Sequence, residues 1–166
     1  MGFVNIFKKW FHFGEQHMKI KDDLKISGEL VIIVTDKSGH ITQSMKVPNL
    51  VVTTGKQYIA SRMAGTTAAV MSHMAIGSGT AAANANNTAL GNELGRAGSP
   101  LFSFQASGNT ITATATFVEG VGTGAISEAG IFNALSGGTM LCRTVFPVVN
   151  KQASDTIAIT WTITIS

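Results

Sequence analysis

Strict alternation of apolar and polar residues predicts two β-strands in this chain. In residues 110–117 threonine occupies every second position, and apolar residues occupy the positions between. Residues 156–165 repeat the pattern, with isoleucine and Trp161 alternating with threonine and alanine. Because successive side chains of a strand point to opposite faces of a sheet, each segment is expected to bury one face and leave the other uncovered.

Further short strands, separated by turn-forming residues, are expected along most of the chain. Asp36 and Gly39 begin and end a four-residue turn of the kind that type I geometry prefers. Closely spaced strands of this kind predict a mainly β fold, an antiparallel β-sandwich of jelly-roll-like or Ig-like type, over residues 26–166. The remaining expected strands are residues 26–35, 40–47, 72–76, 100–106, 126–132 and 139–146.

Two helical segments interrupt the expected strands. Thr53 or Thr54 is expected to cap one short helix that runs through Met63, with Tyr58, Ile59 and Met63 on its buried face. Thr88 is expected to cap a brief helical turn that ends at Leu94. The small polar residues 78–87 between them predict a loop.

Residues 1–25 form a separate N-terminal arm in this scheme. Its apolar residues share one helical face, which favours docking into a groove of a neighbouring subunit. Two other interpretations stay open, in which the arm lies on a membrane surface or folds back onto its own domain. The proposed docking residues are Phe3, Val4, Phe7, Trp10 and Phe11.

The charge of the chain is concentrated in its first 46 residues. Seven lysines and five acidic residues lie there, whereas the following 120 residues hold five basic and four acidic side chains. A surface so poor in charge is hard to keep soluble alone, so we expect neighbouring subunits, including further copies of the chain, to cover much of it. The formal net charge of +3 is spread thinly and predicts no nucleic-acid partner. No apolar run reaches the length of a membrane span, and we expect no membrane partner.

No motif for catalysis, cofactor binding or metal binding is found in the sequence. Residues 77–80 are glycine-rich but lack the Gly-Lys-Ser/Thr of a phosphate-binding loop. The four histidines, His12, His17, His40 and His73, have no metal-ligand spacing. Cys142, the single cysteine, is expected to be a buried reduced thiol. We therefore predict a protein that is not an enzyme and needs no cofactor.

Four charged residues stand out in the apolar part of the chain. Glu93 and Arg96 are three residues apart, and Glu128 and Arg143 lie in strands that are otherwise apolar. Because charged side chains are almost never buried without a partner, we expect structural ion pairs between these acidic and basic residues.

Several short motifs resemble a family of small virion proteins of tailed bacteriophages. The resemblance covers residues 26–166 and implies a β-sandwich, symmetric assembly and no catalysis; the arm lies outside it. Its motifs are residues 48–60, Met74-Ala-Ile-Gly-Ser-Gly-Thr80, residues 88–96, Ile126-Ser-Glu-Ala-Gly-Ile-Phe132, residues 141–146 and Thr156-Ile-Ala-Ile-Thr-Trp-Thr-Ile-Thr-Ile165.

The sequence thus predicts a virion structural subunit that is assembled in the host cytoplasm. The favoured role is a capsid decoration, or cement, protein attached through its arm to other virion proteins. One alternative is a subunit of the tail, neck or fibre base. A second is a host-surface carbohydrate-binding module, although Trp10 and Trp161, the two tryptophans, form no evident sugar platform.

Overall fold

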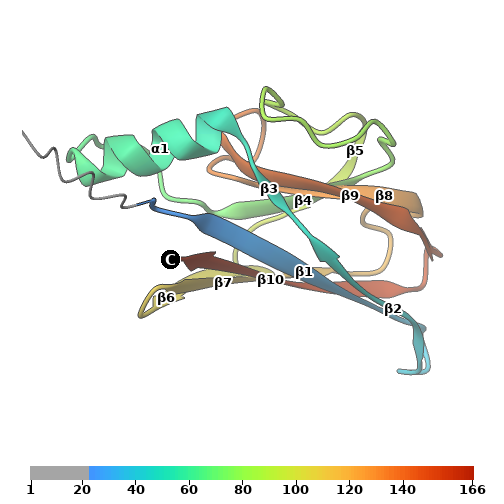
Figure 1. The fold of residues 1–166 in the computed structure, drawn as a ribbon. Coiled ribbons are helices and arrows are strands. Elements are labelled where there is room, and N and C mark those ends of the chain that lie inside the picture. Colours follow the sequence, from blue (N-terminus) through green and yellow to red (C-terminus); the bar gives the residue numbers. More distant parts are fainter. Residues whose placement is uncertain (1–22) are drawn as a thin grey trace, which may run out of the picture.

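The computed structural model describes residues 23–166, which fold into two packed antiparallel β-sheets with one helix beside them (Figure 1). The predicted mainly β sandwich is therefore confirmed. The elements are β1 (Ile26–Thr35), β2 (Ile41–Pro48), β3 (Leu50–Val51), α1 (Thr53–Met63), β4 (His73–Gly77), β5 (Glu93–Ala97), β6 (Phe102–Ser107), β7 (Thr110–Phe117), β8 (Gly124–Phe132), β9 (Met140–Lys151) and β10 (Thr156–Ile165).

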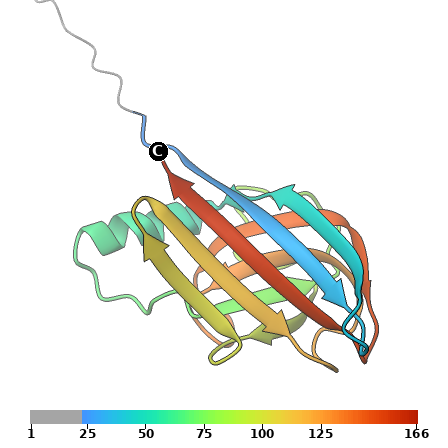
Figure 2. The ribbon, with the colours of Figure 1, turned by 90° about the horizontal axis from the view of Figure 1, so that it is seen from below.

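The first sheet has the strand order β2-β1-β10-β7-β6. The first and last strands, β1 and β10, pair along their full length, from Ile26 opposite Ile165 to Thr35 opposite Thr156. Two backbone hydrogen bonds between Lys25 and Ser166 extend the pairing, at 2.6 and 2.8 Å. The start of the described chain and its C-terminus therefore lie side by side at one end of the sandwich (Figure 2).

The second sheet has the order β3-β9-β8-β4-β5. Its central strand β8 is buried at every position from Ile126 to Phe132. Such a continuous buried run shows that both faces of the strand are covered, one by the first sheet and the other by the loop of residues 78–92.

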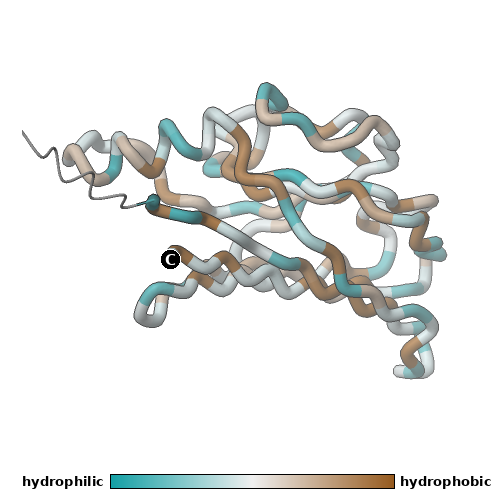
Figure 3. Tube along the Cα trace, in the orientation of Figure 1, coloured by the Kyte–Doolittle hydropathy of each residue, from teal (hydrophilic) through white to brown (hydrophobic). Residues whose placement is uncertain are grey.

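The core lies between the sheets and is built from the inward positions of the alternating strands. Apolar and polar residues alternate along these strands (Figure 3). Trp161 on β10 and Phe117 on β7 are fully buried there, while the threonines beside them face outward. The alternation predicted for residues 110–117 and 156–165 is confirmed in both strand bounds and facing.

Helix α1 spans the predicted residues, but two details of its prediction are wrong. Val52, whose side chain makes no capping hydrogen bond, is the N-cap, and the Thr54 hydroxyl instead donates to the Met140 carbonyl oxygen at 3.0 Å. Met63 is 79% exposed, and Gly55 is the buried residue of the helix. A Cβ on Gly55 would collide with the Leu141 carbonyl, so the helix makes its closest approach to β9 at this glycine. Tyr58 and Ile59 are partly buried and pack against the core, as predicted.

The helical turn expected from Thr88 to Leu94 is also wrong. Residues 93–97 form strand β5, which pairs with β4 from Met74 opposite Ala97 to Gly77 opposite Glu93. Leu, Glu and Arg favour helices in isolation, but the hydrogen-bond ladder offered by β4 overrides that weak preference here.

Candidate functional site

A buried carboxylate organises the outer side of the second sheet. Glu128, in the middle of β8, is completely inaccessible to solvent. Its Oε1 accepts hydrogen bonds from the backbone N–H of Gly79 and of Asn92, each at 2.8 Å. Its Oε2 accepts one from the N–H of Gly91 at 2.9 Å. Glu128 therefore binds both ends of the long loop of residues 78–92, which we call the cover loop.

Arg143, on the neighbouring strand β9, supplies the opposite charge. Its Nε and Nη2 both donate to Glu128 Oε2, at 2.9 and 2.7 Å. The remaining donors bind the middle of the cover loop, with Nη2 donating to the Ala81 carbonyl at 3.1 Å and Nη1 to Asn87 Oδ1 at 2.9 Å. The ion pair predicted for this region is present, and its two members together hold the cover loop at its ends and at its centre.

Glycine at the ends of the cover loop makes this close approach possible. A Cβ on Gly79 would collide with the Glu128 carboxylate, and a Cβ on Gly77 would meet the Asn92 carbonyl. The loop therefore lies with its backbone directly over β8, which explains how a charged residue in a fully buried strand has every oxygen satisfied.

Hydrogen bonding keeps Glu128 ionised inside the protein. Burial by itself would raise its pKa, but the backbone N–H groups of Asn92 and Gly91, the Arg143 guanidinium and the Gly79 N–H outweigh burial and lower the pKa below its ordinary value. The charge is thus part of the folded structure rather than a proton donor available for chemistry.

The second predicted pair, Glu93 and Arg96, is also present, in strand β5. Arg96 Nη2 lies 2.6 Å from Glu93 Oε2. Arg96 also donates to the carbonyl oxygens of Ala134 and Gly137 at 2.7 and 3.1 Å, and its guanidinium lies 4.0 Å from the centre of the Phe132 ring. This pair joins the edge strand β5 to the turn between β8 and β9.

The outward face of the first sheet is very different, because no segment among residues 23–166 covers it as the cover loop and α1 cover the second sheet (Figure 1). The five strands contain just two charged residues, Glu29 and Lys46, which pair with each other at 2.8 Å. Most of the other outward positions carry small polar residues or alanine, and the exceptions on β1 are the half-buried aliphatic residues Val31 and Ile33. In one row Thr160 lies opposite Thr114, and the Thr114 hydroxyl is 2.6 Å from that of Ser103 on β6. We call this surface the threonine face.

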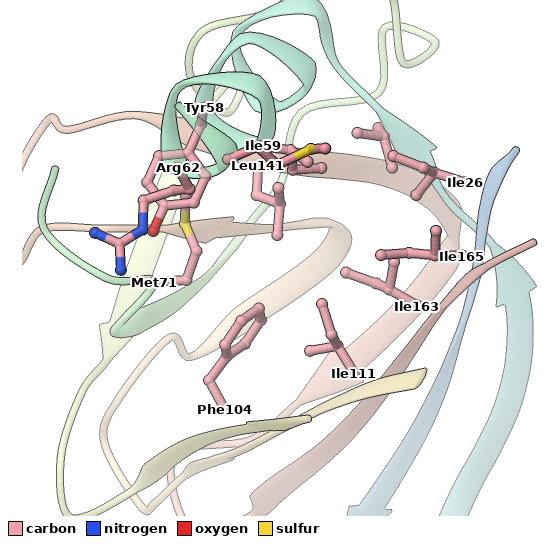
Figure 4. Close-up of a pocket in the computed structure, with 12 residues that line it drawn as sticks. Ile26, Tyr58, Ile59, Arg62, Met71, Phe104, Ile111, Leu141, Ile163 and Ile165 are labelled. Carbon is pink, nitrogen blue, oxygen red and sulfur yellow. The ribbon is translucent and has the colours of Figure 1, made fainter. Parts of the chain in front are cut away.

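An apolar cavity opens at the end of the sandwich beneath α1 (Figure 4). Its volume is about 430 Å³, and it is lined from α1, from both sheets and from the segment before β4. Tyr58 and Arg62 lie at its helical side, and Phe104 and Ile111 lie across from them. An adjoining hollow of about 440 Å³ shares Ile26, Ile59 and Met63 with it. These shared residues form a common wall between the two hollows, which we call together the apolar trough.

One buried cation was missed by the sequence analysis. Lys151, at the end of β9, is 1% exposed, and its Nζ donates to the Val118 carbonyl at 3.1 Å. Burial lowers its pKa, and the nearby charges of Asp155 and Glu119 oppose that shift. A single lysine beside a polar turn gives no sequence signal for burial, because lysine is usually solvated.

The isolated reactive groups do not gather into a centre. Cys142 is buried in β9, as predicted, and burial raises the pKa of its thiol. His73 contacts the hydroxyl of its neighbour Ser72 at 2.8 Å. Within residues 23–166 no three His, Cys, Asp or Glu side chains are placed to share a metal ion. The same part of the chain has no helix of sufficient length and apolarity to span a membrane.

The proposed docking residues of the arm, Phe3, Val4, Phe7, Trp10 and Phe11, lie outside the described residues. Comparisons of the chain with family models, with curated proteins and with solved structures gave no match. The resemblance to phage virion proteins therefore remains a hypothesis drawn from the sequence motifs.

Proposed function

We propose that this protein is a non-enzymatic structural subunit of a tailed-phage virion, bound to neighbouring subunits through its threonine face and its N-terminal arm. Within that class we favour a capsid decoration protein. The observation that carries the proposal is the contrast between the two sheets, since one has its outer side closed by its own chain and the other presents a broad surface almost without charge.

The chemistry of the threonine face favours a protein partner. Exposed sheets and their edges are ordinarily defended by charged side chains, lysine above all. Here the single ion pair between Glu29 and Lys46 carries no net charge, and the edge strand β6 has no charged residue at all. Threonine and serine hydroxyls can exchange hydrogen bonds with water for hydrogen bonds with a partner, so such a face can be buried at low desolvation cost compared with a charged one.

The rest of the site supports a structural role. Glu128 and Arg143, the most deeply buried charged pair, use their hydrogen-bonding groups on each other and on the cover loop. Their role is to hold the cover loop in one conformation. A structural subunit needs such a fixed surface. The motifs that resemble phage virion proteins lie on these same elements, from β3 and α1 through β10.

Copy number in purified particles tests the proposal. Quantitative mass spectrometry of virions is expected to find the chain in a number comparable to the major capsid protein. A small multiple of three or six would place it instead in the tail, neck or fibre base. Absence from the particle would overturn the proposal and reopen the hypotheses of a host-surface carbohydrate-binding module and of an enzyme.

A further inference from the structure

The apolar trough begins where the described chain begins. Leu24, Lys25 and Ile26 line its outer part, and Ile26 also lines the deeper part beneath α1. Two large apolar side chains on its rim face water, since Leu24 is 66% and Met63 79% exposed. A depression with exposed apolar walls of this kind is the usual form of a site that accepts an apolar segment.

The residues that precede the trough include the most aromatic stretch of the chain. Residues 1–13 contain Phe3, Phe7, Trp10, Phe11 and Phe13. Twelve residues separate Phe11 from Leu24. A random-coil chain of that length would have a root-mean-square end-to-end distance of roughly 20 Å, so such a connection would keep the aromatic stretch close to the trough.

We propose that the apolar trough is the docking site of the chain's own N-terminal arm, whose apolar residues Phe3, Val4, Phe7, Trp10 and Phe11 occupy it in the free subunit. The arm's attachment to other virion proteins belongs to the proposed function, and docking into the trough shelters the same residues until assembly. The test below uses the purified chain alone, so either proposal can fail while the other stands.

Connectivity favours the chain's own arm over that of a second copy. A short flexible linker gives a tethered segment an effective concentration in the millimolar range, which a separate copy reaches only at very high protein concentration. The linker enters at the trough itself, through Leu24 and Lys25, so no long detour over the surface is needed.

Site-specific cross-linking of the full-length chain tests the placement. Cysteines are introduced at Asn5, which the sequence pattern predicts to lie off the apolar face of the arm, and at Met63 on the rim of the trough. The protein is then treated with a short bismaleimide. The native Cys142 is fully buried and its thiol pKa is raised, so it should not react. The matched control pairs Asn5→Cys with Ile41→Cys, because Ile41 is 64% exposed and is the first residue of β2. The turn between β1 and β2 lies at the end of the sandwich away from α1 (Figure 1).

The proposal predicts a cross-link within one chain that forms about tenfold faster for the Met63 pair than for the Ile41 pair. Equal rates for the two pairs would overturn it. A covalently linked dimer as the main product would also overturn it, because the arm would then occupy the trough of a second copy.

Fluorescence quenching gives an independent measurement that leaves the arm unmodified. Trp161 is fully buried, so emission that acrylamide can quench comes mainly from Trp10. Met63→Glu places a charge on the trough rim at an exposed position, where folding should be unaffected. We expect Trp10 to be quenched more strongly in Met63→Glu than in Ile41→Glu or the unaltered chain; equal quenching in all three would count against the proposal.

Discussion

Arg143 and Glu128 face each other across neighbouring strands of the second sheet, with Arg143 Nη2 2.7 Å from Glu128 Oε2 and both side chains essentially inaccessible to water. A buried pair of this kind contributes less to stability than its Coulomb attraction suggests, because both charges lose their hydration. The pair instead fixes the position of the cover loop, since every further hydrogen bond of the two side chains is made to that loop.

Removing one member of this pair is expected to destabilise the fold strongly. Arg143→Leu would leave the Glu128 carboxylate buried without its counter-charge, which typically costs about 3–5 kcal/mol of the free energy of unfolding. Urea denaturation of the variant measures the loss. Lys37→Leu is the control, because Lys37 is exposed in the turn between β1 and β2. An unchanged unfolding midpoint for Arg143→Leu would show that the pair does not hold the cover loop.

Because Glu128 is ionised in the folded protein, we expect the free energy of unfolding to depend on pH in the acidic range. The pKa of Glu128 is lower in the folded protein than its ordinary value of 4.5, so its ionised form stabilises the fold at all pH values above that value. This contribution is lost as the pH falls below 4.5 and through the folded-state pKa. The difference in unfolding free energy between the unaltered chain and Glu128→Gln should therefore be constant from pH 7 to 5 and shrink on further acidification. A difference that is the same at pH 3 and pH 7 would contradict an ionised Glu128.

Replacing Gly55 by alanine should destabilise the protein, although the same change in a helix is usually stabilising. Glycine to alanine within a helix ordinarily stabilises a protein by about 1 kcal/mol. Here the added methyl group meets the Leu141 carbonyl, so Gly55→Ala should push α1 away from β9 and cost about 1–3 kcal/mol. Lys56→Ala, at the exposed next position, is the control and should change the unfolding free energy by less than about 0.5 kcal/mol. Thermal melting compares the two, and a stabilised Gly55→Ala variant would mean that the helix packs more loosely on β9.

Much of this fold could be predicted from the sequence, because the strands with the clearest alternation are also those with one covered face. For β7 and β10 the predicted bounds and facing agree with the structure. Strand β5 was missed because Glu93, Leu94 and Arg96 favour helices locally, and only its pairing with β4 makes them a strand. The exposure of Met63 could not be predicted either, because helix periodicity identifies the apolar face of a helix but not how much of that face another segment covers.

The candidate site could be predicted in part. Charged residues within an apolar part of the chain indicated that Glu93 or Glu128 pairs with Arg96 or Arg143, but not which acidic residue pairs with which basic one. Their larger role was beyond prediction, because the cover loop reaches Glu128 through backbone N–H groups that carry no sequence signal. The apolar trough was also missed, since its walls come from segments as distant as Ile26 and Ile163.

Burial of the threonine face against neighbouring virion subunits is tested by particle incorporation of variants with altered residues on this face. Thr160→Lys and Thr114→Lys place charges at exposed, adjacent positions at the centre of this face, while Gln57→Lys places one on the exposed side of α1. All three variants should fold with nearly unchanged melting temperatures. Particles assembled with each variant are purified, and the bound chain is quantified. We predict that the two face variants lose most of their incorporation while Gln57→Lys retains it; full incorporation of Thr160→Lys and Thr114→Lys would contradict the claim.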